Sequence, residues 1–228
     1  MSADFVAHME DVLDLYAEPY DPARPVVCFD ESSTQLLADS RPPLAAKPGK
    51  PRREDYEYVR GGTRNLFLAC EPKAGWRQVA ITQRRTRQDT RQDTRQDFAH
   101  QMRWLVDEAY PDVPVVRLVL DNLNTHRVAS LYETFPPAEA RRIAKRLEFH
   151  HTPKHGSWLN MAEMEFSVLA RACLRGRNPD EDRLEQAVNA SVRERNTASA
   201  PINWSFTTRN ARTKLRRLYH DTTTLTEY

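Results

Sequence analysis

Apolar residues recur with two different periods along the chain, and these periods predict which segments are strands and which are helices. Residues 25–29 and 115–120 are almost continuously apolar, which is typical of buried strands. Shorter runs over residues 56–60, 65–70 and 76–82 predict antiparallel hairpins, with turns at Gly61-Gly62 and at residues 72–75, and residues 147–151 predict a further short strand. Helical spacing predicts helices over residues 4–17, 98–109, 127–134, 138–146, 157–174, 180–195 and 211–219. This order predicts an α/β fold, a mixed sheet with helices on its faces.

Each of the two buried strands ends on an acidic residue. Residues 25–29 lead into Asp30, and residues 115–120 lead into Asp121. If the two strands are parallel neighbours, the two carboxylates lie side by side at the carboxyl edge of the sheet. They then repel each other unless a cation lies between them.

A third acid is expected from the helix whose predicted N-cap is Ser157. Glu163 and Glu165 are the candidates, and helical spacing does not choose between them because the helix is apolar nearly all round. Phosphoryl transfer on DNA uses such a set of acids, since two divalent ions about 4 Å apart serve the attacking and the leaving oxygen. The pattern therefore indicates a site for divalent ions of the kind used in cutting and joining DNA, although an acid at a strand end can also be an ordinary turn or cap residue.

Composition and charge restrict the class of protein. The 228 residues are 39% hydrophobic and 29% charged, which indicates a globular protein, and their net charge is only +2. Any contact with nucleic acid must therefore come from local basic patches. Three widely spaced cysteines favour neither a disulfide framework nor a zinc ribbon. Together with the lack of an apolar run of about 18 residues, this predicts a cytoplasmic, nucleoid-associated protein with no membrane partner.

Two basic segments are candidates for contact with DNA. The proline-rich segment 41–53 is predicted to be an exposed loop, either merely solvated or in contact with phosphates. Its candidate residues are Lys47, Lys50, Arg52 and Arg53. The segment before Glu163 is either an ordinary loop or a phosphate contact made by His151, Lys154 and His155.

Two other features are expected to have no role in the chemistry. Residues 86–97 contain Thr-Arg-Gln-Asp three times, which predicts a solvated loop or a longer start for the next helix. Trp158 is expected to pack in the core rather than to stack on a base, and Trp204 and Phe206 are expected to anchor the C-terminal segment.

Three motifs in order resemble a known family. They are Val-Val-Cys-Phe-Asp-Glu-Ser (26–32), Val-Leu-Asp-Asn-Leu-Asn-Thr-His (119–126) and His-Thr-Pro-Lys-His-Gly-Ser-Trp-Leu-Asn-Met-Ala-Glu (151–163). Together they resemble the catalytic domain of bacterial DDE transposases and are most similar to the insertion sequence 630 family, relatives of the mariner group. The closing Asn-Trp-Ser-Phe-Thr (203–207) resembles that family as well.

The resemblance implies a ribonuclease-H-like fold, with a mixed five-stranded sheet flanked by helices. It implies that Asp30, Asp121 and Glu163 are the catalytic acids and bind two Mg²⁺ or Mn²⁺ ions. The family's Asn-x-x-Glu pattern matches Asn160 and Glu163, which favours Glu163 over Glu165. Residues expected to orient the acids, to touch a phosphate or only to cap an element are Glu31, Asn122, His126, Asn160 and Glu165.

The resemblance also predicts a domain organisation. Residues 1–24 would be an N-terminal helix and linker, and residues 25–228 the catalytic domain. The helix-turn-helix DNA-binding region of the family is absent from this sequence, which indicates a fragment, a truncated copy or one product of a split reading frame. The expected partners are double-stranded DNA, as transposon ends and target, and a second copy or a full-length or N-terminal transposase product.

The predicted activity is hydrolysis of a phosphodiester at a transposon end, followed by transfer of the freed strand into target DNA. One alternative is a ribonuclease-H-like nuclease that cuts without joining. Another is a non-catalytic transposase remnant that binds DNA or partner subunits.

Overall fold

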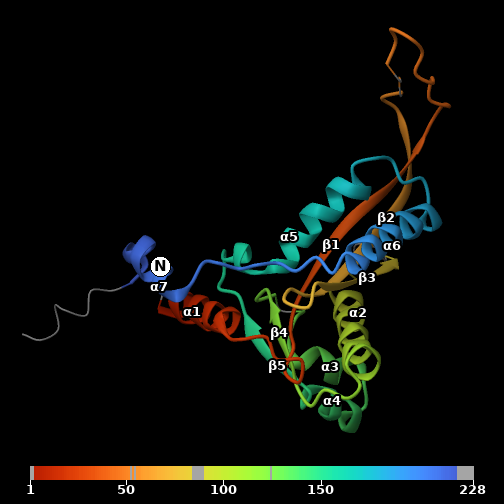
Figure 1. Cartoon of the computed structure of the whole chain (residues 1–228). Coiled ribbons are helices and arrows are strands. Elements are labelled where there is room, and N and C mark those ends of the chain that lie inside the picture. Colours follow the sequence, from red (N-terminus) through yellow and green to blue (C-terminus); the bar gives the residue numbers. More distant parts are fainter. Residues whose placement is uncertain (1–2, 52, 54, 84–89, 124, 220–228) are drawn as a thin grey trace, which may run out of the picture.

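A five-stranded mixed sheet forms the centre of the molecule in the computed structural model, which describes residues 3–51, 53, 55–83, 90–123 and 125–219 (Figure 1). Its order is β3-β2-β1-β4-β5. Neighbours β3, β2 and β1 are antiparallel, whereas β1, β4 and β5 are parallel. The bounds are Val26–Asp39 (β1), Tyr58–Glu71 (β2), Trp76–Gln83 (β3), Val116–Leu120 (β4) and Leu147–His151 (β5). This arrangement confirms the ribonuclease-H-like mixed sheet that the sequence predicted.

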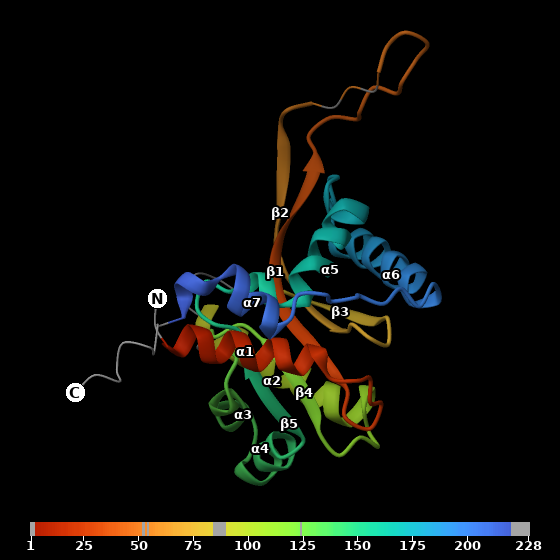
Figure 2. The same cartoon turned by 60° about the vertical axis from the view of Figure 1, so that its left-hand side comes forward.

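Helices cover both faces of the sheet (Figures 1 and 2). One face packs against α1 (Ala3–Ala17), α5 (Met161–Leu169) and α6 (Glu181–Thr197), with α7 (Thr208–Lys214) beside α1. The other face packs against α2 (Thr90–Trp104), α3 (Val128–Thr134) and α4 (Pro137–Ala144). Short helical turns complete the chain at Leu105–Ala109 (η1), Ser157–Leu159 (η2), Ala170–Leu174 (η3) and Arg216–Leu218 (η4). Among the described residues, no helix is both long and apolar enough to cross a bilayer.

The two strands that were predicted over residues 56–60 and 65–70 form one continuous strand, β2. The prediction of a turn at Gly61-Gly62 is wrong because β1 continues to Asp39 and pairs with this stretch, with a bulge between Gln35 and Leu37. A Cβ at Gly61 would lie 3.1 Å from the Cβ of Leu36, so this glycine permits close approach instead of a turn. The extended β1 and β2 form a two-stranded arm that projects from the body (Figure 2).

The second and third Thr-Arg-Gln-Asp repeats, residues 90–97, belong to α2, and the first repeat lies outside the described residues. The expectation of a longer helix start therefore holds for the described part of the repeat. Trp158 was expected in the core, but its side chain is 42% exposed and stacks on Trp204 at 6.2 Å between ring centroids. Trp204 also contacts Tyr16 of α1, and so it does anchor the C-terminal segment.

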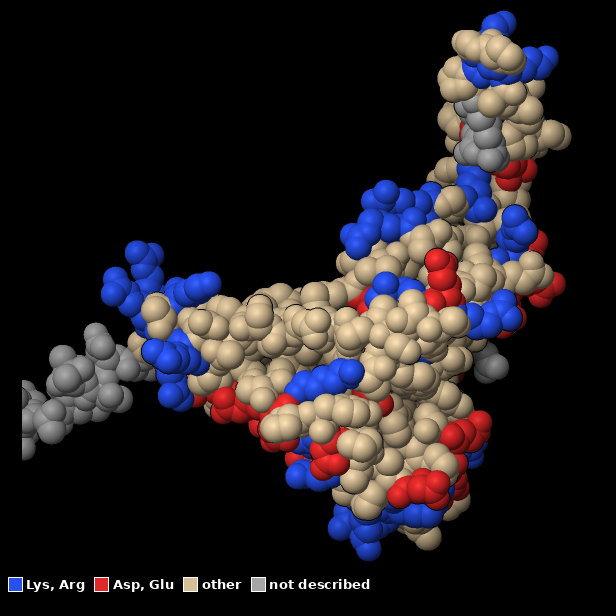
Figure 3. Space-filling model, viewed as in Figure 1, with Lys and Arg blue, Asp and Glu red and all other residues tan. Residues whose placement is uncertain are grey.

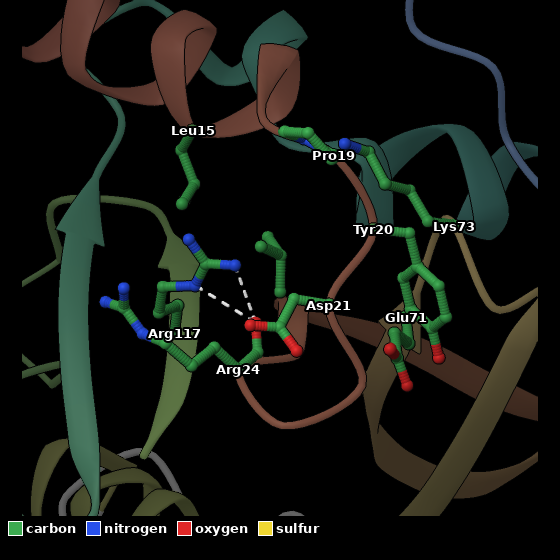
Figure 4. Close-up of a pocket in the computed structure, with 9 residues that line it drawn as sticks. Leu15, Pro19, Tyr20, Asp21, Arg24, Glu71, Lys73 and Arg117 are labelled. Atoms are coloured by element: carbon green, nitrogen blue, oxygen red, sulfur yellow. Dashed lines mark hydrogen bonds between the residues drawn. The ribbon is translucent and has the colours of Figure 1, made fainter.

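The segment between α1 and β1 is fixed at the amino end of the parallel strands. The guanidinium of Arg117 donates hydrogen bonds of 3.1 and 2.6 Å to the carbonyl of Arg24 (Figure 4). It also forms an ion pair with Glu18. The cavity beside it measures about 10 Å³, the space of about one water molecule. The contacts of Arg117 at this end of the sheet are therefore structural.

Candidate active site

The register of the parallel strands places Asp30 and Asp121 at the same level. Cys28 pairs with Val119, and each aspartate lies two residues further along its strand direction, Asp121 just beyond the end of β4. Because side chains alternate with a period of two, both aspartates share the face of Cys28 and Val119. That face is the one covered by α5. The two acids of the predicted strand ends are therefore neighbours on the same side of the sheet.

Asn160 fixes the start of α5 against β1. Its side-chain oxygen accepts a hydrogen bond of 3.1 Å from the backbone N–H of Ala162, which makes Asn160 the N-cap, and the prediction of Ser157 as the cap is wrong. Ser157 instead begins the separate turn η2. The Asn160 amide also donates a 2.9 Å hydrogen bond to the carbonyl of Phe29, the residue before Asp30. One buried side chain thus ties the first turn of α5, which carries Glu163, to the strand that carries Asp30.

The electrostatics of Asp30 indicate that the three acids lie close together. Burial raises the pKa of Asp30 to about 7, and the negative charges of Asp121 and Glu163 add to this effect. The backbone N–H of Glu31, which donates a 2.8 Å hydrogen bond to Asp30, and the charge of His126 act in the opposite direction. A nearby cation would therefore favour the ionised form of Asp30.

His126 connects Asp121 to a fourth acid, Glu31. Its side chain is fully buried between the rings of Phe29 and Phe98, at centroid distances of 5.9 and 4.9 Å. Nδ1 is hydrogen bonded to Oδ1 of Asp121, and Nε2 lies 3.9 Å from Oε2 of Glu31. Burial lowers the pKa of His126, but its hydrogen bond to Asp121 and the nearby carboxylate of Glu31 outweigh this and raise it to about 9. A protonated imidazole therefore orients Asp121.

Glu165 lies in a different environment from Glu163. Its side chain is 4% exposed, and its carboxylate oxygens lie 3.2 Å from Nε of Arg77 and 2.6 Å from Nη2 of Arg195. The two arginines come from β3 and α6, so this network joins three elements of the fold. Both oxygens of Glu165 are occupied by these partners, which leaves Glu163 as the acid of α5 that is available to the site.

The basic candidates divide into two groups. Lys47 and Lys50 form a backbone bridge in the segment at the end of the arm, and Arg53 pairs there with Leu44, whereas Arg52 lies outside the described residues. Figure 3 shows Lys and Arg side chains gathered at the end of the arm and around α7, away from the centre of the molecule. The arm residues therefore do not join the acids.

In the second group of basic candidates, His151 lies beside Asp121. Nδ1 of His151 is 3.2 Å from the carbonyl oxygen of Asp121, and burial is the main cause that lowers the pKa of this histidine. Lys154 and His155 are exposed in the loop that leads from β5 to α5. Phe5 and His8 of α1 line the same cavity as this loop, and the helical pattern of the sequence gave no functional signal for them.

The donor set fits a hard divalent cation. Asp30, Asp121 and Glu163 offer only carboxylate oxygens, which Mg²⁺ and Mn²⁺ prefer, and substrate phosphates and water usually supply the remaining ligands of Mg²⁺. Burial is the main cause of the raised pKa of Asp30, and the negative charges of Asp121 and Glu163 add a repulsion that a cation would relieve. In the part of the chain that is described, no three His, Cys, Asp or Glu side chains already surround a single point closely enough to hold an ion.

Comparison with known proteins gives the family. The sequence matches the model of a family described as DDE superfamily endonuclease over residues 25–185, well over half of the chain. The chain therefore belongs to the DDE superfamily of endonucleases. A search of curated proteins found no match.

Solved structures give weaker likenesses. The "Mos1 transposase paired-end complex with left transposon end" is 12% identical, with a TM-score of 0.41, over 88% of this chain and 62% of that chain. The "Crystal structure of the Mos1 Strand Transfer Complex" is 14% identical, with a TM-score of 0.41, over 86% of this chain and 60% of that chain. A third is titled "Crystal structure of the Mos1 mariner paired end complex with Mn", at 12% identity and a TM-score of 0.39, over 88% of this chain and 62% of that chain. This chain thus spans less than two thirds of the length of these neighbours.

Proposed function

We propose that this chain is the catalytic domain of a DNA transposase of the insertion sequence 630 family, which cuts a phosphodiester at a transposon end and joins the freed 3′ hydroxyl to target DNA. The observation that carries the proposal is the juxtaposition of Asp30 and Asp121 on parallel neighbouring strands, with Glu163 within electrostatic range of Asp30. Membership of the DDE endonuclease superfamily supports it.

Three carboxylates would hold the metal ions in this mechanism. Asp30, Asp121 and Glu163 supply the oxygen ligands, and two bound Mg²⁺ or Mn²⁺ ions would activate the attacking oxygen and stabilise the leaving one. His126 fixes the direction of the Asp121 carboxylate through the bond to Oδ1. Asn160 holds the first turn of α5 on β1, so that Glu163 stays over Asp30.

The remaining residues of the proposal contact DNA. Lys154 and His155, exposed beside the acids, would bind backbone phosphate near the cut, as would His151. Lys47 and Lys50 on the arm would contact the duplex at a distance from the acids. Partners of the domain would be transposon-end and target DNA, with a second copy or a full-length transposase product supplying recognition of the end sequence.

Plasmid nicking tests the cutting step. The chain is incubated with supercoiled DNA and Mg²⁺, and we expect nicked circles from the wild type and none from Asp121→Asn. Asp107→Asn is the matched control, because Asp107 is a surface acid that pairs with Arg142 outside the site. Nicking by Asp121→Asn at the wild-type rate would overturn the proposal.

A joining assay separates the alternatives. A labelled oligonucleotide with a free 3′ hydroxyl end is supplied with a plasmid target, and strand transfer yields labelled plasmid. A nuclease without transferase activity gives nicking and no joined product. A non-catalytic remnant gives neither product, although it would still bind DNA.

A further inference from the structure

A cavity of about 380 Å³ lies between α1 and the loop from β5 to α5. From α1 it is lined by Asp4, Phe5 and His8, and from the facing loops by Asn122, Lys154 and His155. Its volume lies within the range of about 300–1,000 Å³ that is typical of ligand pockets. Residues 4–8 lie outside the part of the chain that matches the endonuclease family, and so the family assignment gives this wall no role.

The cavity opens beside the proposed catalytic acids. Asn122 directly follows Asp121 in the chain. The loop that forms the facing wall begins after His151, which contacts the carbonyl of Asp121 at 3.2 Å, and it ends at Asn160, the cap of α5. Both ends of this wall are therefore tied to residues that carry or position the acids.

The loop itself is rigidly built. His155 has a φ of 66°, a conformation that side-chain-bearing residues rarely adopt. The backbone N–H of Gly156 donates a 2.8 Å hydrogen bond to the carbonyl of Pro153, and a Cβ at Gly156 would lie 2.5 Å from the ring of Pro153. Pro153 and Gly156 are buried, whereas Lys154 and His155 are exposed. The loop thus presents one cationic and one imidazole side chain from a fixed backbone, an arrangement often found at functional sites.

The lining matches the chemistry of a nucleotide. Lys154, His155 and His8 supply N–H donors for a phosphodiester, against the single carboxylate of Asp4. Phe5 is half-buried and supplies an aromatic ring on which a base can stack. The exposed amide of Asn122 has both donors and acceptors for the edge of a base.

We propose that this pocket holds one nucleotide of the DNA strand next to the scissile phosphate, with its phosphate on Lys154 and His155 and its base on Phe5. This inference rests on the proposed function, because it assigns the pocket to the same DNA substrate. It makes α1 part of the substrate-binding surface. A strand held there enters the acid cluster from the side of Asn122.

Binding of a short DNA strand tests the pocket without any cleavage. The full chain, labelled with ¹⁵N-histidine, is titrated with single-stranded thymidine tetranucleotide in EDTA, and Kd is followed by fluorescence anisotropy of the labelled strand. We expect the signals of His8 and His155 to move and the signal of His100, on the opposite face, to stay. Inorganic phosphate at the same concentration should move them much less, because it offers no base for Phe5.

Substitutions then assign the contacts. Lys154→Ala and Phe5→Leu should each weaken binding of the tetranucleotide about fivefold or more, since one stacked base contributes about 1 kcal/mol or more. His155→Asn keeps a residue that tolerates positive φ and should weaken binding with the fold intact. Lys145→Ala, an exposed lysine at the end of α4, is the matched control and should bind as the wild type does.

The outcomes separate the pocket from the proposed function. If Lys154→Ala, Phe5→Leu and His155→Asn all bind as tightly as the wild type, the pocket inference is wrong even when plasmid nicking succeeds. Equal effects of tetranucleotide and inorganic phosphate would also overturn it, because they would indicate an anion contact alone. If the substitutions weaken binding while the wild type fails to nick DNA, the pocket stands and the transposase proposal falls.

Discussion

Two glutamates that lie two residues apart on α5 occupy opposite electrostatic environments. Glu165 is buried between Arg77 and Arg195, and these arginines neutralise it within the protein. Glu163 lies near Asp30, whose pKa its negative charge helps to raise, and no described arginine or lysine forms a salt bridge with it. One helix therefore carries an acid that stabilises the fold and an acid that adds to a local excess of negative charge.

The difference offers a way to distinguish acids with a structural role from candidate catalytic acids. A buried acid with matched cations completes its interactions inside the chain. A group of acids without such cations lowers the stability of the fold. Such a group is expected at a functional site, where a positively charged ligand compensates the repulsion. The two environments predict opposite consequences for the same glutamate-to-glutamine substitution.

The largest expected effect is on catalysis. Glu163→Gln removes one negative oxygen ligand and should lower Mg²⁺-dependent nicking by at least about 10⁴-fold, since the ions contribute several kcal/mol to the transition state. Its unfolding free energy in urea should equal or exceed that of the wild type, because a repulsive charge is lost. Nicking at more than a tenth of the wild-type rate would remove Glu163 from the site.

The second effect is on stability. Glu165→Gln leaves the guanidinium of Arg77, which is 3% exposed, without its carboxylate, and should lower the unfolding free energy by about 3–5 kcal/mol. Urea unfolding at pH 7 measures the loss. Glu133→Gln, which breaks the exposed pair with Arg95, is the control and should change stability by less than about 1 kcal/mol. Equal losses in the two variants would contradict the structural role of Glu165.

The third effect appears in the pH dependence of stability. The folded-state pKa of His126, about 9, lies above its ordinary value of 6.5, so the folded protein binds more protons than the unfolded chain between these values. The stabilisation is complete below pH 6.5 and is lost as pH rises to 9, a decrease of roughly 3 kcal/mol. His126→Asn, whose amide can still donate to Asp121, should remove most of this decrease. His100→Asn should retain it, and an unchanged slope in His126→Asn would refute the assignment.

The sequence predicted those parts of the site that follow from local pattern. Apolar runs that end in Asp30 and Asp121 predicted buried strands with acids at one edge, and the register of β1 and β4 places the two residues at the same level. The prediction was correct because a run of consecutive apolar residues identifies a buried strand, and the polar residues that follow it mark the strand's end. The prediction of a turn at Gly61-Gly62 was wrong because a contact distant in the sequence, the pairing with the end of β1, outweighs the local turn signal.

Contacts between segments that lie far apart in the sequence could not be predicted from the spacing of residues along the chain. Nothing in the spacing along the chain shows that Arg77 and Arg195 meet at Glu165, because the three residues belong to different elements. The choice of Glu163 over Glu165 came from resemblance to a family, and the arginine network supplies its physical reason. The pocket wall formed by Phe5 and His8 gave no functional signal because apolar residues recur there with helical spacing, as in any amphipathic helix.

The smallest expected effect concerns the cap that joins α5 to β1. Asn160→Ala removes an N-cap and leaves the buried carbonyl of Phe29 without its donor, so the unfolding free energy should fall by about 2 kcal/mol. Asp180→Ala removes the N-cap of α6, where the side chain accepts a 2.8 Å hydrogen bond from the backbone of Arg183, and should cost about 1 kcal/mol.

The comparison of these two caps separates stability from positioning. If Asn160 holds Glu163 over Asp30, Asn160→Ala should reduce nicking more than tenfold at a temperature where it is fully folded, and a higher Mg²⁺ concentration should restore part of the rate. Asp180→Ala should nick DNA within about twofold of the wild type, because α6 carries none of the acids. Equal rates in both variants would mean that α5 keeps Glu163 in place without its cap, and that the arginines on Glu165 suffice to hold the helix.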